Sequence, residues 1–121
     1  RYLMADDESP ALRAKVLIET AAERGEPLFV SHVVLCELTW VLASVFRLPK
    51  DALVEALTDI VRTAQFVVEE PDLAARAVSR YARGQADFAD YMIAERSKDA
   101  GCRQVATFDK KLLEEDGFVA P

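Results

Sequence analysis

Apolar residues recur along this chain with two different periods, and the two periods predict alternating helices and strands. Apolar positions three and four residues apart indicate helices, and short apolar, partly β-branched runs indicate buried strands. The predicted helices cover residues 10–24, 33–46, 50–64, 71–83, 86–100 and 109–114. The predicted strands cover residues 27–31, 66–69, 102–108 and 118–120. This order predicts a helix-rich α/β fold with a mostly parallel central sheet flanked by helices.

Local signals mark where several of these elements begin and end. Residues 1–5 resemble the tail of an element, and an acidic turn follows over residues 6–10. Ser9 can cap the first helix, and Pro10 suits its first position. Gly25 ends that helix, and Ser31 caps the next one. Two later helices stop at Gly84 and Gly101.

The helix over residues 33–46 stands out because it is apolar on every side, which is typical of a buried helix. Its only charge is Glu37, and no basic residue of the same helix lies three or four positions away. A carboxylate buried without a partner costs several kcal/mol or takes up a proton. Glu37 therefore either binds a metal or a strong donor, or lies at a pocket rim where it reaches water. The helix alone leaves both interpretations open.

Composition narrows the class of protein. The 121 residues form one domain by length, and no apolar run reaches the ~18 residues of a membrane span. Cys36 and Cys102 lack a CxxC partner, so we expect buried free thiols and a reducing cytosol. His32 is the only histidine, which argues against zinc. The net charge of −6 gives no general attraction to nucleic acid, so an RNA ligand would need cations or local basic patches.

Acidic residues fall at equivalent places after successive predicted strands. Ligands of parallel α/β sheets bind beyond the carboxyl ends of the strands. Glu37 follows the strand 27–31, Asp87 and Asp90 begin the helix 86–100, and Asp109 follows the strand 102–108. Each has a local alternative: Asp109 is a favourable N-cap, and Asp87 in a first helical turn is favoured by the helix dipole. The alternatives do not explain why the acids converge.

The donor type indicates which ion such acids would hold. With no clustered His or Cys, oxygen-only ligands favour Mg²⁺ or Mn²⁺. The remaining acids at the two ends of the chain are expected to be solvated. These are Asp6, Asp7, Glu8, Glu114, Glu115 and Asp116.

The chain resembles PIN-domain ribonucleases, in particular the VapC-like toxins of bacterial toxin–antitoxin pairs. The matching stretches, in order, are Arg1-Tyr-Leu with the acidic turn, SHVVLCELTWVL from Ser31, ADFADYMIA from Ala86 and Thr107-Phe-Asp. The resemblance covers nearly the whole chain and implies a single PIN-like domain over residues 1–121. By this resemblance the metal-site acids are Glu37, Asp90 and Asp109, with Asp87 as a fourth and Thr107 as a polar neighbour.

One element of the family pattern is missing from this chain. The first acid of the family lies in an N-terminal strand, in a motif like Asp-Thr-Asn, upstream of where Arg1 would fall. That strand is central by resemblance, so we expect the natural protein to extend upstream by a short apolar strand containing an Asp. We also expect residues 1–121 alone to be poorly active, because unpaired buried backbone groups are costly.

The resemblance implies a mechanism and partners. The expected reaction is metal-assisted hydrolysis of RNA, in which the acids hold one or two Mg²⁺. The expected partners are RNA, a cognate antitoxin and a second copy in a homodimer, with no membrane association. The helices 10–24 and 50–64 would supply the apolar contact surface. Five basic residues could contact phosphates or could be ordinary surface charges: Arg96, Lys98, Arg103, Lys110 and Lys111.

Two other functions fit parts of the pattern. A phosphoacceptor receiver domain is also α/β with clustered acids, but it needs an acidic pair after an early strand, whereas the pair here is late and on a helix. A catalytically inert PIN-like binding module would keep the fold without the chemistry, and the missing first Asp keeps this alternative open. Metal binding, RNA cleavage and phosphate uptake separate the three functions.

Overall fold

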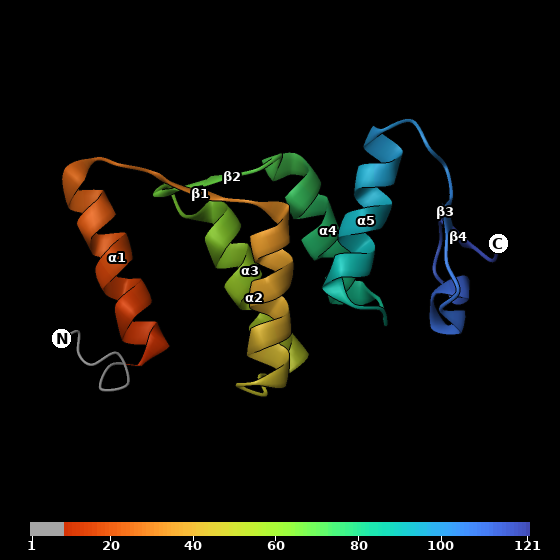
Figure 1. The fold of residues 1–121 in the computed structure, drawn as a ribbon, viewed down its shortest axis with the longest axis horizontal. Coiled ribbons are helices and arrows are strands. Elements are labelled where there is room, and N and C mark those ends of the chain that lie inside the picture. The colour runs from red at the N-terminus through yellow and green to blue at the C-terminus, as the bar shows by residue number, and fades with distance from the viewer. Residues whose placement is uncertain (1–8) are drawn as a thin grey trace.

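The computed structural model describes residues 9–121, arranged as a row of helices with strands between them (Figure 1). The expected element tail at residues 1–5 and the acids Asp6, Asp7 and Glu8 lie outside the described residues. The helices are α1 (Pro10–Arg24), α2 (His32–Ser44), α3 (Lys50–Arg62), α4 (Pro71–Arg83), α5 (Phe88–Asp99) and the 3₁₀ helix η2 (Lys110–Glu114). The strands are β1 (Leu28–Val30), β2 (Phe66–Val68), β3 (Val105–Ala106) and β4 (Phe118–Val119).

The residues predicted to begin and end the first helices do so in the structure. The Ser9 hydroxyl accepts the N–H of Leu12 at 3.1 Å, and the Ser31 hydroxyl accepts the N–H of Val34 at 3.1 Å. Gly25 ends α1 with φ of 66°, a left-handed conformation that favours glycine. These signals place the ends of α1 and the start of α2 close to where the sequence predicts them.

The four strands form two parallel pairs. In β1 and β2, Leu28 pairs with Phe66 and Val30 with Val68. β3 pairs with β4, and among residues 9–121 no ladder joins one pair to the other. The α/β class with parallel strands is confirmed. The predicted single central sheet is therefore wrong for the described residues: the strands form two separate pairs, and α4 and α5 lie between them (Figure 1).

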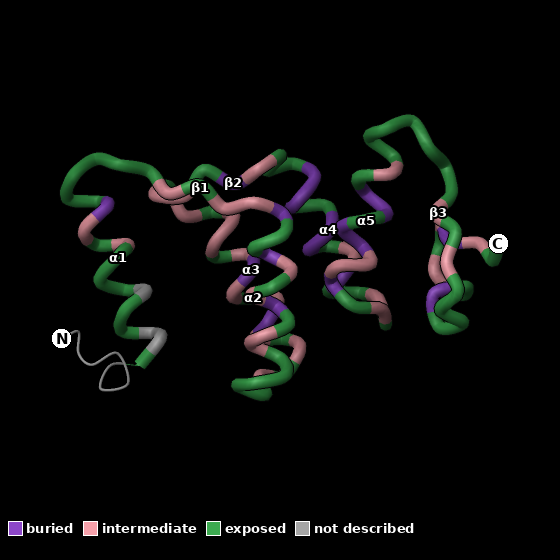
Figure 2. Tube along the Cα trace, in the orientation of Figure 1, coloured by how far each residue is buried: buried purple, intermediate pink, exposed green. Residues whose placement is uncertain are grey.

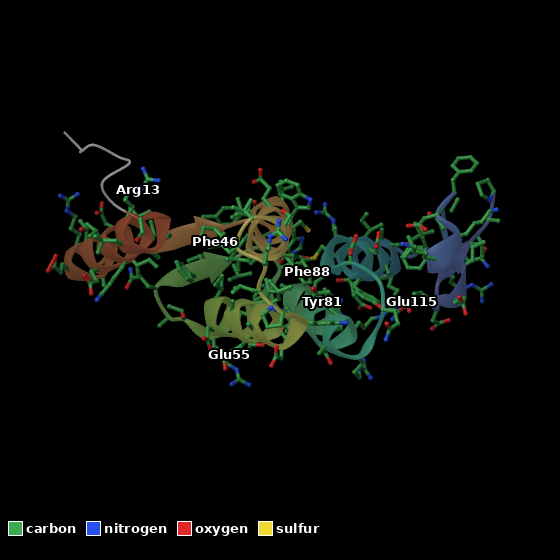
Figure 3. The ribbon with its side chains drawn as sticks, turned by 90° about the horizontal axis from the view of Figure 1, so that it is seen from below. Arg13, Phe46, Glu55, Tyr81, Phe88 and Glu115 are labelled. Atoms are coloured by element: carbon green, nitrogen blue, oxygen red, sulfur yellow. The ribbon has the colours of Figure 1, made fainter. Side chains whose placement is uncertain are left out.

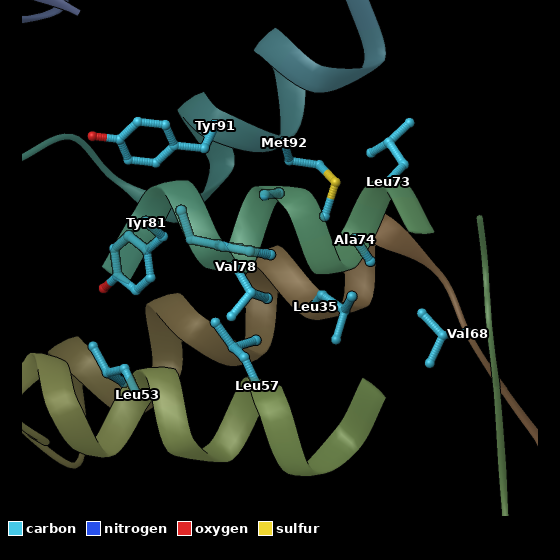
Figure 4. Packing of buried hydrophobic residues seen from close by; sticks show 12 residues of the cluster. Leu35, Leu53, Leu57, Val68, Leu73, Ala74, Val78, Tyr81, Tyr91 and Met92 are labelled. Carbon is cyan, nitrogen blue, oxygen red and sulfur yellow. The ribbon is translucent and has the colours of Figure 1, made fainter. Parts of the chain in front are cut away.

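One hydrophobic cluster joins α2, α3, α4, α5 and β2 (Figures 2 and 4). Its most buried members include Leu35, Leu57, Ala74, Phe88 and Tyr91. Burying a side chain the size of leucine stabilises a fold by roughly 1.5–3 kcal/mol, so this cluster is the main support of the helices. It fixes where α5 begins, and the candidate site lies at that end of the helix.

A second, smaller cluster holds the C-terminal segment against α5. Ala94 of α5 packs with Leu112 of η2 and Phe118 of β4, and all three are buried. This contact brings η2 beside α5 although the two elements are separated by a loop and a strand in the sequence. It therefore sets the position of Asp109, which lies directly before η2.

The two helices expected to expose apolar surface differ. α1 lies at one end of the molecule (Figures 1 and 2). It leaves Leu12, Val16 and Leu17 exposed. α3 instead buries its leucines and offers only one wall of a groove of about 250 Å³ that it shares with α4.

No helix within residues 9–121 combines the length and the apolar character that crossing a membrane requires.

Candidate active site

Three carboxylates line one pocket of about 430 Å³ between the start of α5 and η2. They belong to Asp87, Asp90 and Asp109. The remaining lining residues are Gln85, Ala86, Lys111, Leu112 and Glu114. The pocket thus joins two segments that are about 20 residues apart in the sequence, as the placement of acids after successive strands predicts.

Asp87 and Asp90 are held by the first turn of α5. Asp87 is the N-cap residue, and the Oδ2 atom of Asp90 accepts its backbone N–H at 3.2 Å. Residues three apart share one face of a helix, and the positive end of the helix dipole favours carboxylates there. Local helix-start chemistry therefore orients both acids toward the same pocket.

Asp109 is positioned by the turn between β3 and η2. Its Oδ1 atom accepts the N–H of Lys111 at 2.9 Å, so it caps the 3₁₀ helix. Its own N–H donates to the Thr107 hydroxyl at 3.0 Å. The capping role that the sequence offered as an alternative is thus present, and it coexists with a place in the pocket wall.

The surroundings of Asp90 shift the pKa of its carboxyl group. Burial raises the pKa of Asp90 above its ordinary value, and the charges of Asp87, Asp109 and Glu115 raise it further. The hydrogen bond between Asp90 and the Asp87 backbone opposes this rise. Asp90 is therefore partly buried and faces other carboxylates around the same pocket.

Glu37 does not line this pocket, and it is exposed on the surface of α2. The helix buries only His32, Leu35 and Thr39, which form a single side, so the prediction of burial on every side is wrong. The physical reason is that the described part of the chain packs against this one side only. The alternative in which Glu37 reaches water is the one observed.

The residue before Glu37 nevertheless lies near the pocket. Burial raises the pKa of the Cys36 thiol, the charge of Arg96 lowers it, and the charge of Asp90 raises it. α2 therefore passes beside the start of α5. The structure brings Asp87, Asp90 and Asp109 together and leaves Glu37 on the outer side of this neighbouring helix.

The pocket fits a hard divalent ion in donor type but not as a closed cage. Within residues 9–121, no three His, Cys, Asp or Glu side chains are grouped closely enough to hold an ion. Mg²⁺, however, usually keeps several waters and is bound through one or two carboxylates plus substrate phosphates. An open pocket walled by carboxylates is compatible with that mode.

Comparison with protein families identifies the fold. The family model described as PIN domain matches residues 2–117. The chain belongs to the PIN domain family. A curated relative of this PIN domain is a VapC ribonuclease of Aquifex aeolicus (strain VF5), which is 23% identical over 108 residues. The match covers 89% of this chain and 80% of the relative. No solved structure matches the chain.

The sequence did not predict a hydrogen-bonded bridge beside the pocket of this PIN domain. The Tyr91 hydroxyl donates to Oε1 of Glu115 at 2.6 Å and accepts the backbone N–H of Ala86 at 3.0 Å. Glu115 was expected to be solvated, but it is half-buried and points from the C-terminal segment toward α5 (Figure 3). Its partner lies 24 residues away, so no local signal could reveal the contact.

A buried acid, Glu95, was also missed. Its side chain is 2% exposed and accepts hydrogen bonds from Arg76 Nε at 2.9 Å and Arg80 Nη1 at 3.2 Å. Burial by itself raises the pKa of Glu95, but these two hydrogen bonds and the charge of Lys98 outweigh it and hold that pKa below its ordinary value. Arg76 and Arg80 lie one helical turn apart, and that spacing was the available signal. Glu95 clamps α4 to α5 and lies outside the acidic pocket.

The expected basic residues have different surroundings. Lys111 lines the acidic pocket, and Lys98 binds Glu95 at 3.4 Å. Arg96 lies 3.4 Å from Nδ1 of the buried His32. Arg103 and Lys110 are exposed. Lys111 is therefore the best placed of the five to meet a ligand of the pocket.

The two cysteines are free thiols with different environments. Cys36 is half-buried, whereas Cys102 is exposed in the turn after α5. The prediction of burial is therefore wrong for Cys102. The reason is that residues 101–104 form an exposed loop before β3.

Proposed function

We propose that this PIN domain is a Mg²⁺- or Mn²⁺-dependent endoribonuclease and the toxin of a type II toxin–antitoxin pair. The observation that carries the proposal is the shared pocket of Asp87, Asp90 and Asp109 together with the raised pKa of Asp90. Acids that repel one another in a pocket are relieved by a bound cation. Groups with perturbed pKa values in a pocket are candidates for function.

Each pocket residue has a role in the proposed reaction. Asp90 and Asp109 face the pocket from two elements and would hold the ion, with Asp87 as a further oxygen ligand. A bound divalent ion would lower the pKa of its water and offset charge on the scissile phosphate. Lys111 lies in the same wall and would contact a phosphate oxygen. Glu37 stays in the proposed ligand set on the family resemblance alone.

The proposed substrate and partners follow from the relative and from the net charge. The relative is named a ribonuclease, which supports RNA as the substrate. With a net charge of −6, the protein would approach RNA through cations at the acidic pocket. We propose a cognate antitoxin and a homodimeric partner, with residues 1–121 belonging to a single PIN-like domain that works in the reducing cytosol.

The direct test is cleavage of a labelled RNA with Mg²⁺, with Mn²⁺ and in EDTA. We expect hydrolysis only with a divalent ion. Asp90→Asn and Asp109→Asn should each lower the rate at least about a hundred-fold, as removal of a charge-stabilising group does. Asp59→Asn is the matched control, because Asp59 is exposed on α3 outside the pocket.

The other outcomes separate the alternatives. Cleavage in EDTA would overturn the role of the ion, and full activity of Asp90→Asn would overturn the site. RNA binding without cleavage would favour the inert binding module, and covalent phosphate uptake would favour a receiver domain. Glu37→Gln tests the acid that lies apart: unchanged activity would remove Glu37 from the ligand set.

A further inference from the structure

A second pocket adjoins the acidic one and is mainly apolar. It has a volume of about 160 Å³ and lies among α2, the end of α4 and the start of α5. Trp40, Tyr81, Phe88 and Asp87 are among its walls. Asp87 also lines the acidic pocket, so the two pockets share this residue as a common wall.

Trp40 gives this second pocket an accessible aromatic face. It is the only tryptophan of the chain, and 67% of its surface is exposed. It lies on α2, one turn beyond Glu37. A large flat apolar surface in water beside a polar pocket provides a platform on which a planar ring can stack.

Tyr81 adds a residue with a hydroxyl group to the pocket wall. Tyr81 is only 7% exposed, and its ring meets the ring of Phe88 edge-on, with the two ring centroids 5.8 Å apart (Figure 3). Lys50 Nζ lies 4.7 Å from the centroid of the Tyr81 ring. Tyr81 lines the pocket, and its hydroxyl takes part in no hydrogen bond found among residues 9–121. The hydroxyl is not among the buried polar atoms that lack a partner, so water reaches it. The Thr39 hydroxyl is occupied, because it donates to the carbonyl of Leu35 at 2.7 Å.

The Tyr81 hydroxyl is in its neutral form at physiological pH. Burial raises the pKa of Tyr81, and the charge of Asp87 raises it further. The hydroxyl can therefore both donate and accept a hydrogen bond. This ability matches the mixed donors and acceptors along the edge of a nucleobase.

We propose that this pocket binds one base of single-stranded RNA, with Trp40 stacking on the base and the Tyr81 hydroxyl bonding to its edge. The inference rests on the proposed function and extends it, because it places a base contact beside the phosphate-binding acids. Asp87 lines both pockets, and this supports a nucleotide as the ligand. A nucleotide carries a flat ring and a phosphate a short distance apart, so one nucleotide can occupy both. An apolar protein segment would use the second pocket alone.

The lone tryptophan makes base stacking directly measurable. The 121-residue chain is titrated with four tetraribonucleotides, A₄, C₄, G₄ and U₄, with Ca²⁺ in place of Mg²⁺ and with the integrity of the RNA checked on a gel. We expect quenching of Trp40 fluorescence that saturates with RNA and is stronger for some bases than others. An abasic oligonucleotide with the same phosphates should bind more weakly and leave the fluorescence unchanged.

Variants identify the contacts by affinity for a labelled tetranucleotide. Trp40→Leu should weaken binding by about five-fold to about 150-fold, the usual range for one stacked base, whereas Trp40→Phe should retain most of the affinity. Tyr81→Phe should reduce the discrimination among the four bases. Phe46→Leu is the matched control, because Phe46 is an exposed aromatic residue that follows the C-cap of α2 and does not line the pocket.

Several results would overturn the proposal. They are equal quenching by the abasic strand, wild-type affinity of Trp40→Leu, or a fluorescence change that follows protein concentration without RNA. The last result would assign Trp40 to a contact between copies of this chain. Quenching in Ca²⁺ together with no hydrolysis in the separate cleavage assay with Mg²⁺ or Mn²⁺ would contradict the nuclease proposal and keep the base pocket. Hydrolysis without quenching would contradict the base pocket alone.

Discussion

Asp90 lines the acidic pocket, and the charges of the neighbouring acids act on its carboxyl group. It lies three residues after Asp87 on the same helix face and across the pocket from Asp109. Its raised pKa records both partial burial and the repulsion of nearby acids. A group kept ionised under these conditions lowers the stability of the folded state, because the folded protein binds the proton more readily than the unfolded chain.

Replacing Asp90 with Asn should therefore leave metal-free stability unchanged or raise it. The raised pKa means that ionised Asp90 opposes folding. This cost is complete above the folded-state pKa, decreases as the pH falls through it, and is gone below the lower, ordinary pKa of the unfolded chain. We expect Asp90→Asn to melt at the same or a higher temperature than wild type at pH 7 in EDTA. The difference should shrink at acidic pH.

Thermal melts from acidic to neutral pH test this, with Asp59→Asn as the control for loss of an exposed acid. A clear drop in melting temperature for Asp90→Asn at pH 7 would show that the hydrogen bond between Asp90 and the Asp87 backbone matters more than the repulsion.

At the scale of elements, the connection between α4 and α5 decides where the acids lie. Lys50 Nζ donates to the Gly84 carbonyl, and the Tyr91 hydroxyl accepts the N–H of Ala86. Gly84 has an ordinary negative φ of −101°, so its backbone angles do not require glycine. The nearby Tyr91 side chain is what requires glycine at this position, because a Cβ at residue 84 would lie 1.7 Å from the Tyr91 hydroxyl oxygen.

Gly84→Ala should consequently destabilise the fold through a clash rather than through backbone strain. Overpacking costs typically about 1–3 kcal/mol. Tyr91→Phe should cost about 1–3 kcal/mol by leaving the Ala86 N–H and the Glu115 carboxylate without this partner. The double variant should cost less than the sum, because the hydroxyl that clashes is gone.

Urea unfolding of the two single variants and the double variant measures this coupling. Relief should be only partial, since the ring carbon that carries the hydroxyl still lies 2.5 Å from the added Cβ. Strictly additive losses would mean that Gly84 is needed for a reason other than Tyr91.

At the scale of the whole molecule, the helices stand side by side and α1 lies at the end of the row (Figure 1). Only Ala21 among its described apolar residues is buried, whereas Leu12, Val16 and Leu17 are exposed. A group of exposed apolar residues on one helix often marks a contact with another protein. α1 therefore satisfies the expectation of an exposed apolar surface, whereas α3 uses its leucines in the core.

Polar substitutions on α1 should weaken association without weakening the fold. For Val16→Ser combined with Leu17→Asn, we expect the free energy of unfolding to stay within about 1 kcal/mol, because each exposed substitution contributes about 0.5 kcal/mol or less. Self-association measured by sedimentation velocity should fall. Glu19→Gln on the same helix is the control. Unchanged association of the variant that combines Val16→Ser with Leu17→Asn would exclude α1 from the interface.

Local interactions explain what the sequence by itself determined. Helix periodicity, the caps at Ser9 and Ser31 and the break at Gly25 depend on residues a few positions apart. They gave the order of helices and strands, the parallel class and the start of α5, where Asp87 and Asp90 share a face. The alternation of strands and helices also predicted that Asp109 would join them, because strand ends meet on one side of such a fold.

Only the tertiary structure decided which faces are covered. α2 is apolar all round, yet its burial depends on what packs against it, and this leaves Glu37 and Trp40 in contact with water. Glu115 and Glu95 became structural acids because Tyr91 and two arginines from distant turns reach them. Such contacts join residues far apart in the sequence, so the pattern of neighbouring apolar and polar residues does not predict them. For the same reason, the local pattern does not reveal that the strands form two separate pairs with α4 and α5 between them.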